Sequence, residues 1–184
     1  MSKVSIANRA LALLGENKIT SIDDDTPGAK AVANVYTGSL RSILSETCWN
    51  FAKKRAMLNR LKDKPVWGRG NYFQLPADMV RLFKVSADNY KIEGNKLLVD
   101  ADEVGILYTY YNEDDTNYSP AFVDAFVHRL AYDICYDLTN AASRQEAILT
   151  TYTGHFLPTA LSMNARDNTP DEVRDDFWVN KVGY

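Results

Sequence analysis

The stretch WNFAKK, residues 49–54, marks the point at which the pattern of this chain changes. Before it, apolar residues recur every three to four positions, which is typical of amphipathic helices. After it, for roughly sixty residues, apolar and polar residues alternate loosely as they do in strands, and helical spacing returns near Pro120. The sequence therefore predicts an α+β fold, in which two helices precede and two follow an inserted antiparallel sheet.

The two helices before this stretch have recognisable ends. The first is predicted from Val4 to Leu14, and Gly15 follows at the place of a C-terminal glycine cap. The second begins after Thr26, a capping residue, and has Pro27 at the first helical position, where no backbone N–H is missed. Its apolar positions continue at helical spacing for about five turns.

The insert is predicted to contain several short strands. Gly94 and Asn95 separate two strand-like runs and form a two-residue hairpin signal. The segment 104–111 is rich in β-branched and aromatic residues and is expected to be the last strand. Because the connections are too short for parallel crossovers, we expect an antiparallel β-meander.

Helical spacing resumes with Ser119 as a cap and Pro120 as the first helical residue. A fourth helix is predicted from near Ser143, and Pro158 interrupts its pattern. A proline at that position removes one backbone hydrogen bond, so we expect a kink or a break there.

These elements predict a four-helix bundle that carries the β-meander as an insert. The helices lie within residues 4–48 and 120–168, the insert covers 51–112, and together they form a single domain over 1–168. No periodicity is found in 169–184, which is expected to be a flexible, extended C-terminal arm.

Composition narrows the class of protein. The 184 residues carry a net charge of −3, so no global basic field attracts nucleic acid. Cys48 and Cys135 are expected to be free thiols. There is no signal-peptide pattern and no apolar run near the roughly 20 residues that span a bilayer, so we expect no membrane partner and folding in a cytoplasm.

Candidate catalytic and metal-binding residues are scattered. Asp124 and His128 are four residues apart and are expected to form a surface pair rather than a general base. The acidic clusters 23–25 and 113–115 do not have the ligand spacing of a calcium loop. Gly68 and Gly70 flank an arginine with no following helix signal, which indicates a loop rather than a phosphate cradle. The sequence predicts no enzyme, no cofactor and no metal site.

The densest positive region begins directly after Phe51 and includes Trp67. Its basic residues are Lys53, Lys54, Arg55, Arg60, Lys62, Lys64 and Arg69. Three interpretations stay open: protection of a sheet edge against aberrant pairing, a docking surface for an acidic partner, and nucleic-acid binding by phosphate contacts and stacking.

The arm is unusual because it carries aromatic anchors. Phe177, Trp178 and Tyr184 are residue types that a partner groove captures, although they can also fold back onto the chain's own helices.

Several stretches in order and spacing carry a family likeness. They are ALALLGE (10–16), ITSIDDD (19–25), CWNFA (48–52), LPADMVRL (75–82), YKIEGN (90–95) and PAF (120–122). Over residues 5–155 this order resembles the tail tubular protein A group, the head-to-tail adaptors or connectors of tailed phages with short tails.

The resemblance implies a structural virion protein. Such adaptors form rings, dodecameric in the family, between the portal protein and the nozzle or tail tube, and they extend the DNA channel without specific DNA binding. The family's C-terminal segments reach toward the portal, which implies a portal-docking arm here: Asp171, Arg174, Phe177, Trp178, Val179 and Tyr184. A contact loop for the tail or a neighbouring subunit is expected at Lys62, Lys64, Trp67 and Arg69. Pro158 departs from the unbroken helix that the family pattern implies.

Two other functions are compatible with the sequence: another neck or tail-completion protein of the virion, and a nucleic-acid-binding module. A binding module would show affinity that falls steeply with salt, whereas an adaptor would show little such dependence.

Overall fold

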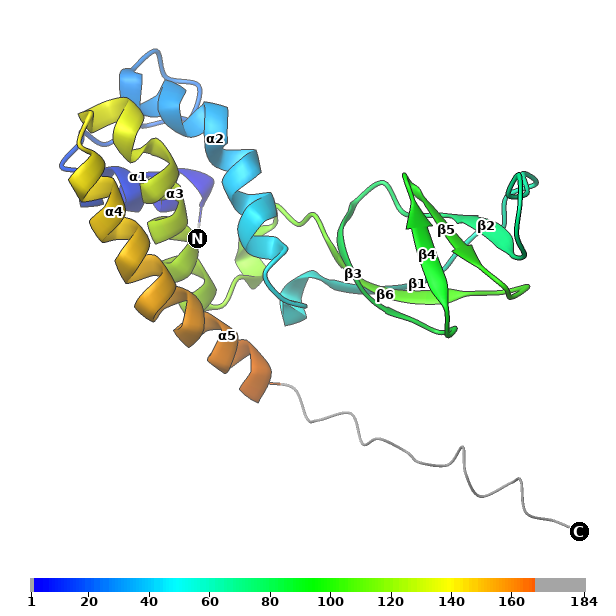
Figure 1. The fold of residues 1–184 in the computed structure, drawn as a ribbon. Helices are drawn as coiled ribbons and strands as arrows, with labels where there is room; N and C mark the ends of the chain where they lie inside the picture. The colour runs from blue at the N-terminus through cyan, green and yellow to red at the C-terminus, as the bar shows by residue number, and fades with distance from the viewer. Residues whose placement is uncertain (1, 168–184) are drawn as a thin grey trace, which may run out of the picture.

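The computed structural model describes residues 2–167, and the arm expected over 169–184 therefore lies outside the described residues. Within them, the fold combines helices with two small antiparallel sheets, which confirms the α+β class (Figure 1). The α-helices are α1 (Lys3–Leu13), α2 (Pro27–Leu44), α3 (Pro120–Thr139), α4 (Ala142–Thr151) and α5 (Leu157–Arg166).

The predicted helix starts are confirmed. The Thr26 hydroxyl accepts a hydrogen bond from the Ala29 N–H at 3.2 Å, and Pro27 is the first residue of α2. Ser119 does the same for α3 through the Phe122 N–H at 3.3 Å. Both caps satisfy a backbone donor that the first helical turn leaves without a partner.

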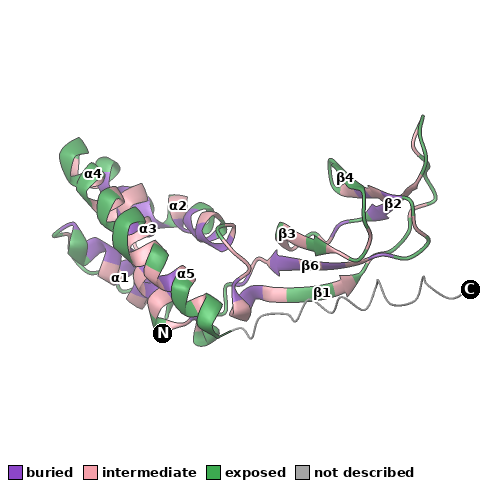
Figure 2. Ribbon diagram, turned by 60° about the horizontal axis from the view of Figure 1, so that its bottom comes forward, coloured by how far each residue is buried: buried purple, intermediate pink, exposed green. Residues whose placement is uncertain are grey.

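The helices pack around α3, which contacts α1, α2, α4 and α5. Their buried apolar residues, purple in Figure 2, belong to one core. Trp49, at the start of the stretch 49–54, is completely buried and packs edge-on against Phe122 with ring centroids 4.9 Å apart. Its indole N–H donates to the Ile43 carbonyl at 2.8 Å, so the one polar atom of this side chain is also satisfied.

The six described strands form two three-stranded sheets with orders β1-β6-β3 and β2-β5-β4. Their bounds are β1 (Lys53–Met57), β2 (Asn71–Gln74), β3 (Met79–Val85), β4 (Tyr90–Glu93), β5 (Lys96–Val99) and β6 (Gly105–Tyr110). The expectation of a single meander was therefore wrong. β1, the first strand, pairs over its whole length with β6, the last strand. This long-range pairing places β1 and β6 in one sheet, whereas the β4–β5 hairpin belongs to the other sheet.

The predicted hairpin is confirmed, since Glu93 pairs with Lys96 across the two-residue turn and Gly94 has a φ of +62°. The inner faces of the two sheets share a second apolar core, around Phe73, Leu97 and Ile106. We call residues 53–110 the β part.

Pro158 does not end the fourth helical segment. The preceding turn, Tyr152–Phe156, is a π-helix, and the Leu157 N–H bonds the Tyr152 carbonyl five residues back. Widening this turn accommodates the ring and the missing N–H of Pro158, so α4 and α5 continue in the same general direction (Figure 1).

A set of hydrogen bonds joins the β part to the helices. The Arg81 side chain in β3 donates to the Ser45 carbonyl at the end of α2 at 2.5 Å. The Thr109 hydroxyl in β6 donates to the Thr47 carbonyl at 3.3 Å. These bonds satisfy backbone carbonyls of the segment that follows α2, and they join the sheet to the helices.

Candidate functional site

The residues of the predicted contact loop lie at the end of the β part remote from the helices, in a segment that we call the tip loop, residues 62–70 (Figure 1). Its start is anchored, because the Leu61 N–H donates to the Tyr72 carbonyl at 2.8 Å. Its end runs into β2, where Asn71 pairs with Val99, and Gly70 packs so closely that an added Cβ would lie 3.0 Å from the Val99 carbonyl oxygen. The loop is thus held at both ends while its middle projects.

The middle of the tip loop exposes two large apolar side chains. Val66 is 100% exposed and Trp67 is 82% exposed. Beside them is a hollow of about 380 Å³, whose lining includes Trp67, Arg69, Tyr72 and Leu98. Tryptophan is one of the residue types that contribute most to binding energy in protein interfaces. Large apolar side chains exposed together on a projecting loop therefore indicate an interaction site.

The cations of the tip loop are free to meet a partner. Lys62, Lys64 and Arg69 are exposed and make no ion pair with any residue from 2 to 167. Asp63, by contrast, pairs with Lys96 at 3.4 Å, and Arg60 just before the loop pairs with Asp102 at 2.8 Å. The structure therefore gathers an exposed tryptophan and three uncompensated cations in one loop.

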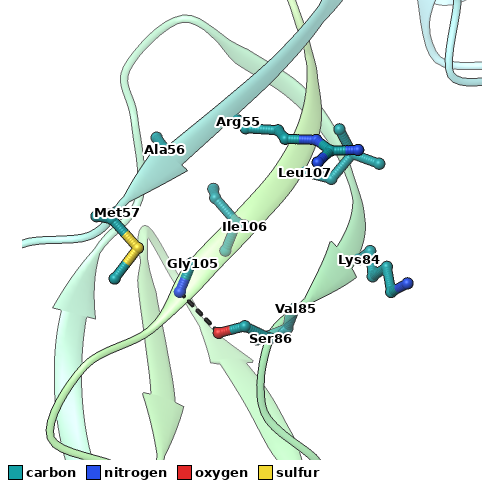
Figure 3. A pocket seen from close by; sticks show the side chains of 9 residues that line it. All are labelled: Arg55, Ala56, Met57, Lys84, Val85, Ser86, Gly105, Ile106 and Leu107. Carbon is teal, nitrogen blue, oxygen red and sulfur yellow. Dashed lines mark hydrogen bonds between the residues drawn. The ribbon is translucent and has the colours of Figure 1, made fainter. Parts of the chain in front are cut away.

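A second surface lies on the side of the β1-β6-β3 sheet that faces away from the shared core (Figure 3). We call it the outer face and define it by Arg55, Met57, Lys84, Gly105 and Leu107. These residues line a groove of about 400 Å³. Of them the sequence analysis singled out only Arg55, because no local pattern indicates that β1 and β3 flank β6.

The predicted portal-docking residues Asp171, Arg174, Phe177, Trp178, Val179 and Tyr184 lie outside the described residues. The described chain ends next to the junction with the β part. Near the end of α5, the Asn164 side chain accepts from the Asn50 N–H at 2.9 Å and donates to the Cys48 carbonyl at 3.2 Å. The sequence analysis did not identify Asn164, since a single polar residue on a helix carries no signal of such a contact.

The predicted pair of Asp124 and His128 takes another form. The Asp124 carboxylate bonds Arg9 at 2.5 Å, and the His128 Nδ1 lies 2.8 Å from the Asp124 backbone carbonyl oxygen instead. His128 stacks on Phe156 with ring centroids 3.6 Å apart. The Asp124 carboxylate is therefore engaged by Arg9 and is not aligned with the His128 imidazole.

The two acidic clusters have local structural roles. The Asp24 carboxylate accepts from the Ser21 and Thr20 N–H groups, and these bonds lower the pKa of Asp24. Asp114 accepts from the Thr116 N–H at 3.1 Å, and the hydroxyl and N–H of Thr116 lower the pKa of Asp114. Within residues 2–167 no three His, Cys, Asp or Glu side chains converge as metal ligands.

One charged contact supports the β part near the junction. The Lys54 ammonium pairs with Asp78 at 2.7 Å, and Tyr108 donates to the same carboxylate at 3.2 Å. Burial raises the pKa of Asp78, but the hydrogen bonds and charge of Lys54 outweigh it, so the pKa of Asp78 lies below its usual value.

The expectation of free thiols is confirmed, with Cys135 buried and Cys48 half-buried. Burial raises the pKa of the Cys48 thiol, which makes it a poor nucleophile at neutral pH.

Comparison with known proteins adds no relative: no protein-family model and no curated protein sequence matches this chain. None of the helices in the described part of the chain combines the length and apolar character that a membrane span requires.

Proposed function

We propose that this protein is a structural component of a virion, a head-to-tail adaptor whose copies form a ring between the portal protein and the nozzle or tail tube. The ring would extend the DNA channel without binding DNA specifically. The proposal includes the dodecameric number and the single adaptor domain over 1–168 that the sequence resemblance implies.

The observation that carries the proposal is the tip loop. Trp67, 82% exposed, projects from a segment anchored at both ends, with three uncompensated cations around it. The large apolar side chains of this loop stay in contact with water, so they add no hydrophobic stabilisation to the fold of their own chain. The loop suits a docking element for the tail protein or for a neighbouring subunit.

The junction between helices and sheets supports the same proposal. A head-to-tail contact closes into a ring only when each copy is rotated by the same angle relative to the last. If lateral contacts involve both parts of the molecule, their mutual angle must be constant. The bonds of Arg81, Thr109 and Asn164 across the junction provide that constraint.

The packing of α1, α2, α4 and α5 around α3 supports a bundle-like body as the base of the ring. For the arm we propose portal docking through the aromatic residues Phe177 and Trp178, on the basis of sequence alone.

The decisive experiment uses particles produced without this protein. We expect heads that package DNA and then lose it, and restoration of DNA retention when the wild-type protein is supplied in trans. Intact, infectious particles lacking the protein would refute the proposal. Supplying Trp67→Ala should weaken the contact that the loop makes, tail attachment or the contact between neighbouring subunits, about 30-fold or more, since a hot-spot tryptophan contributes about 2 kcal/mol or more.

The nucleic-acid-binding alternative has a direct control. The full chain should show no DNA affinity that falls steeply between 50 and 200 mM salt, which is roughly the range over which phosphate-dominated binding is lost.

A further inference from the structure

The outer face of the β1-β6-β3 sheet has an ordered pattern of charge. Arg55 and Lys84 are both register partners of Leu107, one from β1 and the other from β3. Because neighbouring strands are about 4.8 Å apart, the two cations flank the leucine across a width of about 10 Å. Neither cation forms an ion pair with another residue in 2–167.

The next row of the same face is apolar and lines the groove. Met57 pairs with Gly105, and the Ser86 hydroxyl accepts from the Gly105 N–H at 2.8 Å (Figure 3). Because Gly105 has no side chain, the Met57 side chain lies across it, and an added Cβ would be only 3.2 Å from the Met57 sulfur. Met57 is 67% exposed, so the groove offers an apolar row directly beyond the two cations.

One segment of the chain has the complementary pattern. Residues 51–112 contain eleven Lys and Arg against seven Asp and Glu, whereas 169–184 contain two against four. Within the latter, Asp175 and Asp176 immediately precede Phe177 and Trp178. In an extended chain neighbouring side chains point in opposite directions, so the two aspartates match two cations on opposite walls of a groove.

The spacing along the groove agrees as well. The two rows are two residues apart on β1, which is about 6.7 Å, and Trp178 follows Asp176 by the same two residues. A segment that enters from the helical end meets the cations before the apolar row. In the arm the acidic residues come before the aromatic ones, which is the order in which such a segment meets the two rows.

The chain's own arm is within reach of this groove. Asn164 contacts Asn50, and Arg55 is five residues farther along, a distance of at most about 18 Å. From Asp167 to Asp176 the chain spans up to about 30 Å. The end of the outer face nearest the helices lies close to Asn50, since the Thr109 hydroxyl on the same face donates to the Thr47 carbonyl.

From these observations we propose that in the free protein the segment 175–179 docks on the outer face of its own chain, with Asp175 and Asp176 on Arg55 and Lys84 and Trp178 over Met57 and Gly105. In the free protein the groove thus binds the aromatic arm, and it releases the arm when a partner protein binds the arm instead. The inference concerns the free chain and does not depend on the proposed ring, so either can fail alone.

The test measures tryptic cleavage after Lys181 in the full, native chain, read by mass spectrometry as loss of residues 182–184. When closing is fast, cleavage follows the population of undocked arm. We expect Arg55→Glu/Lys84→Glu to raise this rate about tenfold, since two exposed ion pairs are lost. The matched control Lys91→Glu, an exposed lysine of the other sheet, should leave the rate unchanged.

Asp175→Asn/Asp176→Asn should give the same rise, and combining both pairs of substitutions should add nothing further. Arg55→Gln/Lys84→Gln, which introduces no negative charge, is the second variant, and thermal denaturation verifies that each variant is folded. A zero-length carbodiimide cross-link should join Lys84 to Asp175 or Asp176 within one chain. Unchanged cleavage in both groove variants, or cross-links only between two chains, would overturn the proposal.

Discussion

The side-chain oxygen of Asn164 accepts a hydrogen bond from the backbone N–H of Asn50 at 2.9 Å, and the side-chain amide of Asn50 donates a second one to the Asn164 backbone carbonyl at 3.0 Å. The two residues are 114 positions apart, and together they fasten α5 to the segment that leads into β1. Together with the bonds of Arg81 and Thr109, this pair of asparagines therefore sets how the last described helix and the first strand lie relative to each other.

Replacing this residue should loosen the junction. We expect Asn164→Ala to lower the free energy of unfolding by about 2 kcal/mol, because partly buried donors and acceptors on 48–50 lose their partners. Urea denaturation measures the change. Asn34→Ala, at an exposed position of α2, is the control and should change stability by less than about 0.5 kcal/mol. Equal effects of the two substitutions would refute the role of Asn164.

The two tryptophans Trp49 and Trp67 should respond oppositely to truncation. Trp49→Ala removes a fully buried ring from the helical core and should destabilise the protein by about 3–5 kcal/mol. Trp67→Ala removes an exposed ring and should change stability by less than about 0.5 kcal/mol. Thermal and urea denaturation of both variants tests this, and a large loss in Trp67→Ala would show that the tip loop serves folding.

The Lys54–Asp78 contact predicts a dependence of stability on acid. The pKa of Asp78 is depressed in the folded protein, so its contribution is present above about pH 4, the unfolded value, and is lost as pH falls through the folded pKa. The stability difference between wild type and Asp78→Asn should therefore shrink as pH is lowered from 6 toward about 2. Asp88→Asn, at an exposed position, is the control, and a difference that stays constant with pH would contradict the prediction.

Two glycines should behave differently when a methyl group is added. Gly38 lies in α2 with nothing within 4 Å of an added Cβ, so Gly38→Ala should raise stability by about 0.5–1 kcal/mol. Gly70 has a φ of +120° and its Cβ would meet the Val99 carbonyl, so Gly70→Ala should cost about 1–3 kcal/mol. Urea denaturation measures the free energy of unfolding of both variants. A Gly70→Ala variant more stable than the wild type would contradict the close packing of Gly70 against Val99.

Local patterns were sufficient for much of the secondary structure. Thr26 with Pro27 and Ser119 with Pro120 predicted two helix starts, and Gly94 with Asn95 predicted the hairpin, because capping and turn formation depend on neighbouring residues. The effect of Pro158 was less predictable. A proline indicates a missing hydrogen bond, but whether the helix breaks or widens into a π turn depends on the helices packed around it.

The candidate surfaces divide in the same way. The tip loop could be found from its composition, since Lys62, Lys64, Trp67 and Arg69 lie within one short segment. The outer face could not, because Arg55, Lys84 and Leu107 become neighbours only through pairing of β1 and β3 with β6. Strand pairing between distant segments has no local signature, and a shift by one residue would place these side chains on the opposite face.

By itself, then, the sequence determined the class of the fold, the ends of its helices, the hairpin and the position of the basic, tryptophan-bearing loop, all of which follow from interactions between residues a few positions apart. Only the tertiary structure decided that the strands form two sheets, that Asn164 and Arg81 hold these sheets to the helices, and that two cations flank a leucine on an open face. Those features arise from contacts between distant segments, which form when the two apolar cores are buried and the strand edges satisfy their backbone hydrogen bonds.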